Sequence, residues 1–383
     1  MYSSDVDMKA ALGDFVIEDM MFRYSSFVAR LYNFCKSLGF ERGKILPSRA
    51  FCSDESQGYP VILIAKHFGT FPFNHGRVGG VVSTDRHGPY AEHGKDLVII
   101  HASHVGYDAD TCSFGSYRRL HTKHCDVRPS CGKIDGVLEW YVNEYAFAKA
   151  NIFLERHGGH LMVTIDNQLL KENRSEGLFL NMQKVVLPED GEKLQPIKSY
   201  STSKCYLASS ELRALMGDSA WPTSGRRQIG DGLSPELFRF KRNIPEDLET
   251  HGYLEQNLLP AMAFIVTSKA PLLTAAQVNT QMEFDRTYRT LVEAKGYRGK
   301  QMVFISGLHI DISPREGQLF PLTKFVPWAA FVQKQDGDCS LIEQKDLFTQ
   351  LFHQREDNPD EVDLEAVIQK MKNTEEIKVK LPG

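Results

Sequence analysis

The chain has 383 residues, of which 42% are hydrophobic and 25% are charged, and its formal net charge is −4. These proportions are typical of a globular protein and exclude a collagen-like, disordered or coiled-coil chain. The small negative charge provides no basic field for nucleic acid or anionic lipid, and no apolar run reaches the ~18 residues of a membrane span. The first residues lack the apolar core of a signal peptide, so we expect a soluble, cytoplasmic protein, or an organellar one if a leader was removed.

Helical patterns begin near the N-terminus and recur along the chain. Residues 7–38 carry a broad apolar stripe at helical spacing, which predicts a helical arm that packs on its own core or on a partner subunit. The same spacing predicts further helices over residues 136–157, 275–293 and 363–372.

Short apolar runs separate the helical segments. Runs that are continuous rather than alternating are typical of strands buried on both faces of a parallel sheet. Five such strands are predicted, at residues 61–65, 97–100, 161–165, 261–267 and 301–305. The polar stretch over residues 173–260 gives no clear element.

This alternation predicts an α/β fold with a mostly parallel sheet flanked by helices. We predict three parts: the N-terminal helical arm over residues 1–40, an α/β domain over residues 41–335, and a charged C-terminal extension over residues 336–383.

Cysteines and histidines gather in the first third of the chain. Four of the seven cysteines lie between Cys52 and Cys131, and eight of the thirteen histidines lie between His67 and His124. An odd number of cysteines spread over a long chain argues against a disulfide scaffold. Reduced thiolates together with imidazoles suit zinc.

Three short motifs supply candidate ligands. Cys52 and Asp54 follow a predicted strand end, and residues two apart in a strand point the same way. His101 and His104 follow the strand over residues 97–100, where ligands often project from the carboxyl ends of parallel strands. Cys131 precedes a predicted helix, whose dipole stabilises a thiolate. Each motif is weak alone, because His101 also fits a structural histidine and Cys131 an inert buried thiol.

A second group of possible ligands lies nearby. No standard zinc-finger spacing relates its members, and a solvated polar loop explains them equally well. The group comprises Cys112, His121, His124 and Cys125.

In combination, the motifs resemble the LCIB-type carbonic anhydrases, the limiting-CO2-inducible family of algae and microbes, whose fold is a variant of the β-class carbonic anhydrase. The resemblance covers roughly residues 10–335. It runs through residues 52–55, 71–73, 104–106, 115–119, 130–132 and 302–307.

The resemblance implies a function and a site. It implies a zinc ion held by Cys52, His104 and Cys131, with His104 chosen over His101 because the family histidine precedes Val-Gly. It implies that Asp54 works beside the metal, paired with an arginine. The expected activity is the reversible hydration of CO2 to bicarbonate by metal-bound hydroxide, in a homodimer or higher homo-oligomer.

One departure from the β-class pattern concerns the arginine. Ordinary β-class enzymes carry it two positions after the aspartate, where this chain has Ser56. Arg118 and Arg119 are the candidates to replace it.

Two alternatives stay open at this point. A weak or inactive zinc-binding subunit of an assembly would have its fourth metal position closed by a protein side chain. A hydrolase would use Cys52 or Cys131 as the nucleophile with a histidine base. For proton export, His67, His75 and His101 are candidate relays, although each also fits a structural role.

Overall fold

The computed structural model describes residues 15–82, 96–118, 127–188, 194–244, 252–315, 317–318 and 320–378. The chain divides into two compact units. One comprises residues 129–279, and the other comprises residues 15–128 together with residues from 280 onward. Each is described by itself. The predicted boundaries near residues 40 and 335 stay a prediction.

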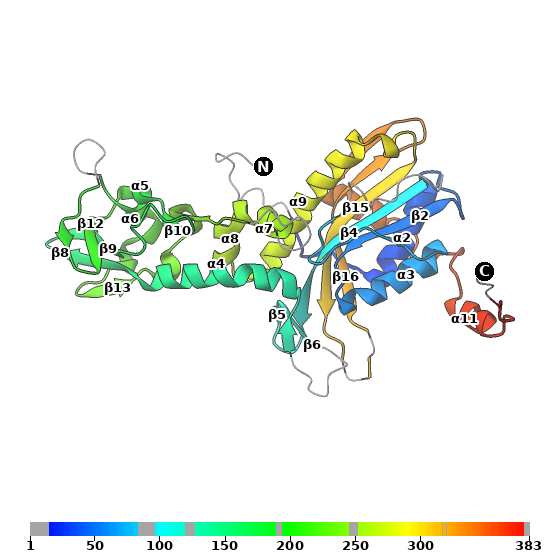
Figure 1. Ribbon diagram of the computed structural model, residues 1–383, viewed down its shortest axis with the longest axis horizontal. Helices are drawn as coiled ribbons and strands as arrows, with labels where there is room; N and C mark the ends of the chain where they lie inside the picture. Colours follow the sequence, from blue (N-terminus) through cyan, green and yellow to red (C-terminus); the bar gives the residue numbers. More distant parts are fainter. Residues whose placement is uncertain are drawn as a thin grey trace, which may run out of the picture. The chain divides into compact units, whose positions relative to one another are not determined.

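The unit of residues 15–128 and 280–378 is built on a mixed sheet (Figure 1). Within the described residues its strands run in the order β1-β16-β15-β4-β2-β3, with β17 beside β16 and β5 beside β4. The central pairs β15–β4, β4–β2 and β2–β3 are parallel. The prediction of an α/β fold with a mostly parallel sheet is therefore confirmed.

The elements of this unit have the following bounds. The strands are β1 Phe22–Arg23, β2 Ile45–Phe51, β3 Phe73–Asn74, β4 Asp96–Asp108, β5 Ser113–Phe114, β6 Ser116–Arg118, β15 Met302–Ile312, β16 Leu322–Gln333 and β17 Cys339–Glu343. The helices are α2 Tyr24–Ser37, α3 Gly58–Phe68, α10 Gln344–Phe352 and α11 Leu364–Lys372, with a 3-10 turn at Glu55–Gln57. Helix α9, Pro271–Glu293, begins in the other unit.

Both faces of the sheet are covered, which explains the continuous apolar run over residues 97–100 of β4. On one face, Val98 and Ile100 of β4 pack with residues of α2, α3 and α10. On the other face, Leu97 and Ile99 pack with Phe284 and other residues of α9. Because successive side chains in a strand point to opposite faces, a strand covered on both faces can bury apolar side chains at consecutive residues.

The unit of residues 129–279 combines one long helix with antiparallel strands. Its five-stranded sheet has the order β11-β12-β9-β8-β13, and β10 pairs with β14. Its elements are α4 Gly132–Ala150, β8 Ile152–His157, β9 His160–Asp166, β10 Gly177–Leu180, α5 Met182–Val185, β11 Lys198–Ser199, β12 Ser203–Leu207, α6 Ser210–Met216, β13 Arg226–Gln228, β14 Phe238–Lys241, α7 Gly252–Leu258 and α8 Met262–Thr267. Strand β7, Val127–Pro129, crosses the boundary between the units.

Several predicted elements are confirmed. The runs at residues 97–100, 161–165 and 301–305 lie in β4, β9 and β15, and the helices predicted over residues 275–293 and 363–372 correspond to α9 and α11. None of the helices in the described ranges has the length and apolar character that crossing a bilayer requires.

Two predicted strands are wrong. Residues 61–65 lie in α3, and residues 261–267 lie in a 3-10 turn and α8. A short apolar run fits a buried helix as well as a buried strand, so periodicity could not separate the two. Helix α3 buries Leu63, Ile64 and Phe68 and ends at Gly69, whose left-handed φ of 72° closes it.

Two predicted helices have different bounds. The N-terminal helix begins only at Tyr24, after the short strand β1, and residues 7–14 of the predicted arm lie outside the described residues. The helix predicted over residues 136–157 ends at Ala150, and β8 follows from Ile152. In β8, Ile152 and Leu154 are buried alternately, which is the strand period of two.

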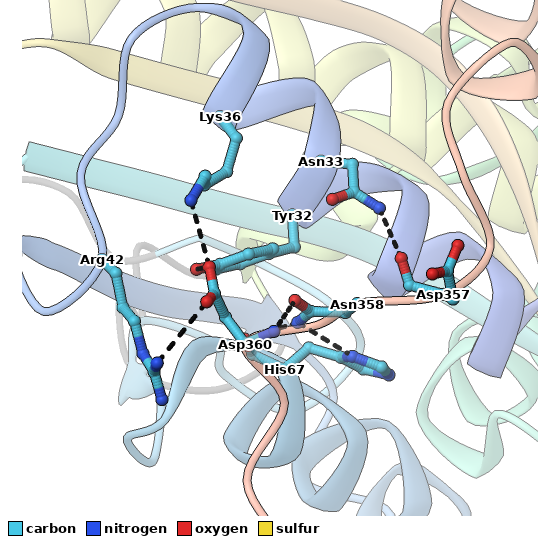
Figure 2. A network of polar contacts seen from close by, with 8 residues as sticks. All are labelled: Tyr32, Asn33, Lys36, Arg42, His67, Asp357, Asn358 and Asp360. Atoms are coloured by element: carbon cyan, nitrogen blue, oxygen red, sulfur yellow. Dashed lines mark hydrogen bonds and ion pairs between the residues drawn. The ribbon is translucent and has the colours of Figure 1, made fainter.

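The C-terminal extension is tied to α2 and α3 through residues 356–362, which we call the strap (Figure 2). Asp360 accepts hydrogen bonds from Tyr32 and Lys36, and Asn358 donates to the carbonyl oxygen of His67 at 3.0 Å. The backbone nitrogen of Val362 donates to Lys66 of α3. The extension therefore belongs to this unit through side-chain and backbone contacts.

The strap also helps to bury a histidine. The His67 side chain is 6% exposed. Burial lowers its pKa from 6.5 to about 4, although the charge of Glu361 opposes the shift. The unfolded chain takes up a proton at His67 below about pH 6.5, and the folded chain does so only near pH 4. Stability is therefore lost as the pH falls through this window.

We predict that His67→Gln makes the protein less sensitive to acid. The His67 shift alone removes about 2 kcal/mol of unfolding free energy between pH 7 and pH 5. Urea unfolding at both pH values measures the difference. The exposed His353→Gln serves as the control and should behave as wild type. An equal pH sensitivity of wild type and His67→Gln would contradict the prediction.

Candidate metal centre

The alternation of side chains along β4 separates its two histidines. By this alternation His101 lies on the same face of β4 as Leu97 and Ile99, and His104 lies on the same face as Val98 and Ile100. The two rings therefore lie on opposite faces of the sheet. Only one of them can join a site on a given face.

His104 is fully buried and is backed by a carboxylate. Its Nδ1 lies 3.0 Å from Oδ2 of Asp311, which is fully buried on the neighbouring strand β15. The strands are parallel, with His104 opposite His309 and Gly106 opposite Asp311. An ionised carboxylate only accepts hydrogen bonds, so Nδ1 carries the proton and Nε2 presents its lone pair. That is the tautomer that ligates a metal.

Asp311 is buried in surroundings that favour its carboxylate form. Burial raises the pKa of Asp311, but hydrogen bonds from His104 and Ser56 lower it, and the net shift is downward. Oδ2 accepts from Ser56 Oγ at 2.9 Å and from Gln57 Nε2 at 2.7 Å, and Oδ1 accepts from Thr323 at 3.0 Å. A buried charge is tolerated when it is paired and hydrogen-bonded in this way.

Cys52 follows the last residue of β2 and is buried. Its Sγ accepts a hydrogen bond from the backbone nitrogen of Gly79 at 3.2 Å, which favours the thiolate form. The adjacent Gly80 is held by His101, whose Nε2 donates to its carbonyl oxygen at 3.0 Å. Burial lowers the pKa of His101 to about 4. His101 thus supports the loop beside Cys52 as a neutral structural histidine.

Cys131 follows a strand that pairs with β6. Strand β6 pairs with β7, which ends two residues before Cys131. At Gly106 of β4, an added Cβ would lie 2.7 Å from the backbone oxygen of Ser116 in β6. A side chain at Gly106 would therefore push β6 away. Glycine follows His104-Val105 because the backbone must approach closely here.

These three side chains form one cluster. Their ligand atoms all lie within 4.8 Å of one another, and all three residues are buried. Ligand atoms of a tetrahedral zinc site lie about 3.5–3.8 Å apart, given metal–ligand distances near 2.0–2.3 Å. Two thiols and one imidazole at this separation could hold a metal ion, and the donor set suits zinc.

The predicted partners of Asp54 are only partly described. Asp54 is half-buried and caps the turn Glu55–Gln57, accepting a hydrogen bond from the backbone nitrogen of Ser56 at 3.1 Å. The Arg118 guanidinium donates to Asp110 at 2.8 Å. Arg119 lies outside the described residues. The pairing of Asp54 with either arginine stays a prediction.

The remaining predicted side chains lie elsewhere or outside the described residues. His67 contacts the strap, and the Nδ1 of His75 lies 3.1 Å from the Ser48 hydroxyl. Cys112 is exposed. The other possible ligands of its group are outside the described residues: His121, His124 and Cys125.

Sequence reasoning missed three residues that support the site. Asp311 and His309 lie on the same strand, and their spacing of two in a strand pattern places them on one face. That spacing could have pointed to them. Gln57 joins the two, since its amide nitrogen donates to Asp311 and its oxygen lies 2.5 Å from His309 Nδ1. Nothing in the sequence marks Gln57.

No protein-family model matches the chain, and no curated protein matches it in sequence. Among solved structures, PtLCIB4, a homolog of the limiting CO2-inducible protein LCIB, matches with a TM-score of 0.51 and 13% identity over 88% of this chain and 99% of that chain. A histidine-to-alanine variant of PtLCIB4 matches with a TM-score of 0.51 and 13% identity over 87% of this chain and 96% of that one. At this identity the likeness concerns the fold alone, and the chain has the fold of PtLCIB4.

Proposed function

We propose that the protein is a zinc-dependent carbonic anhydrase that hydrates CO2 reversibly to bicarbonate. The observation that carries the proposal is the buried cluster of Cys52, His104 and Cys131, whose ligand atoms lie within 4.8 Å of one another. The fold shared with PtLCIB4, a homolog of the limiting CO2-inducible protein LCIB, supports the same reading.

Four residues of the chain would have separate roles in this reaction. Zinc, when bound, lowers the pKa of water so that hydroxide is available near neutral pH. Cys52, His104 and Cys131 would hold the ion. Two thiolates would neutralise the charge of the ion, so the surrounding residues would have to restore its acidity. Asp54, two residues after Cys52, would accept a hydrogen bond from the water that reacts with CO2 and orient it.

A second candidate function rests on the pairing of His104 with Asp311. A thiol beside an imidazole that a carboxylate orients is also the arrangement of a cysteine nucleophile with its base. Two thiols at one imidazole favour the metal site, because a hydrolase needs only one. Alkylation by iodoacetamide separates the two functions: zinc protects Cys52 and Cys131 in the metal site, and a nucleophilic cysteine reacts in zinc-saturated protein.

Two further expectations belong to the proposal. A catalytically inactive zinc-binding subunit would retain the metal and show no hydration of CO2, so the activity assay below decides between the two. The homodimer implied by the family resemblance stays a prediction, and sedimentation of the purified chain measures it.

The proposed zinc site can be tested by its metal content. The purified protein should contain about one zinc ion per chain, and Cys52→Ser or Cys131→Ser should lose it, because serine is a poor zinc ligand. Elemental analysis of each variant measures the ratio. The exposed Cys339→Ser serves as the control. Cys112→Ser tests the alternative group, and loss of zinc in this variant with retention in Cys131→Ser would overturn the assignment.

The proposed activity can be tested by the rate of CO2 hydration. Zinc-loaded protein should hydrate CO2, and Asp54→Asn should reduce the rate by roughly 10²-fold or more while the zinc content is unchanged, because it removes a group that handles the proton. Stopped-flow measurement with a pH indicator gives the rate. Asp338→Asn, at an exposed loop far along the chain, is the matched control. A wild-type rate equal to that of buffer would end the proposal.

A further inference from the structure

A chain of buried hydrogen bonds begins at Nδ1 of His104. His104 Nδ1 is hydrogen-bonded to Asp311 Oδ2, and the same oxygen is hydrogen-bonded to Gln57 Nε2. Gln57 Oε1 is in turn hydrogen-bonded to His309 Nδ1. His104, Asp311 and His309 are fully buried, and Gln57 is 1% exposed. Water therefore does not replace any of these contacts.

The direction of each hydrogen bond in this chain is fixed. The carboxylate of Asp311 can only accept, so His104 and the Gln57 amide nitrogen both donate to it. The Gln57 oxygen then faces His309, whose Nδ1 must donate. His309 is packed against the rings of Tyr24, Phe51 and Phe325, which hold it in place. One orientation of every group satisfies the network.

The same carboxylate also holds the turn that follows Cys52. Ser56 and Gln57 both donate to Asp311 Oδ2, and both belong to the turn that Asp54 caps. Asp311 therefore joins three parts of the site: the strand of His104, its own strand β15, and the turn of Asp54. Residues 56 and 57 are remote from Asp311 in sequence, at separations of 255 and 254.

We infer that Asp311 is a positioning residue for metal binding, which fixes His104 in the tautomer with a proton on Nδ1 and clamps the turn of Asp54 to the strand of His104. The inference rests on the proposed metal site. Asp311 does not touch the ion or the substrate in this role. Carboxylates that orient a ligating histidine typically contribute about 10- to 100-fold to metal affinity.

The test uses the full chain and two measurements. Asp311→Asn removes the negative charge that favours a proton on Nδ1 of His104 and leaves only a weaker, neutral acceptor, so zinc affinity should fall about 10- to 100-fold in competition with a chromophoric chelator. In metal-free protein, 15N chemical shifts of His104 should show the Nδ1-protonated tautomer in wild type and loss of that preference in Asp311→Asn. The tautomer is measured without bound metal and without an activity assay, so it reports directly on how His104 is positioned.

Thr323→Val is the matched control. Thr323 donates to Oδ1, the oxygen of Asp311 that does not face His104. This variant perturbs the same buried carboxylate, so it should lower stability, but its His104 tautomer should stay that of wild type and its loss of zinc affinity should be much smaller than that of Asp311→Asn. Equal losses in Thr323→Val and Asp311→Asn would show a general effect of destabilisation and overturn the inference.

Two further variants test the inference in case Asp311→Asn does not fold. Ser56→Ala and Gln57→Leu each remove one donor to Oδ2, and each should weaken zinc binding severalfold. Wild-type affinity and tautomer in both would overturn the inference. If wild-type protein binds zinc but does not hydrate CO2, the proposed enzyme fails and the positioning role stands on the affinity and tautomer results. A wild-type chain that binds no zinc overturns both.

Discussion

The pairing of β4 with β15 is the constraint on which the site depends. Both strands are buried on both faces, and their parallel register sets His104 opposite His309 and close to Asp311. A slip of one residue would turn every side chain of a strand to the other face. It would turn His104 away from Asp311 and put Ser103 or Val105 in its place. The hydrophobic cores on the two faces of the sheet therefore specify the register, and with it which histidine lies beside Asp311.

The network around Asp311 shows how a fold can keep charge inside an apolar sheet. The carboxylate accepts four hydrogen bonds, from His104, Ser56, Gln57 and Thr323. A buried polar network stabilises only when each member is satisfied, since the low dielectric that strengthens the bonds also penalises a missing one. The donors come from β4, β16 and the turn after β2, so the network also fixes how these elements pack.

The sequence allowed some of this to be predicted, and the reasons differ by element. Helix α9 is predicted because its apolar spacing is long and clear, whereas the short run at residues 97–100 predicts only the first part of β4, Asp96–Asp108. The residue run 61–65 was assigned to a strand because five apolar residues fit either element, and its tertiary packing in α3 decides. Cys52, His104 and Cys131 are predicted from a family resemblance. The alternation of side chains along β4 could by itself have shown that His101 and His104 point to opposite faces of the sheet. Gln57 could not be found, because its role depends on a contact 254 residues away.

The long sequence separation within the site has a consequence for synthesis of the chain. His104 and Asp311 are 207 residues apart. At translation rates of about 5–20 residues per second, His104 leaves the ribosome roughly 10–40 s before the carboxylate of Asp311. During that interval β4 also lacks its neighbour β15, so an apolar strand edge stands open. A nascent chain thus carries Cys52, His104 and Cys131 before their buried surroundings exist, and the cluster is complete only when the last strands of the sheet have been synthesised.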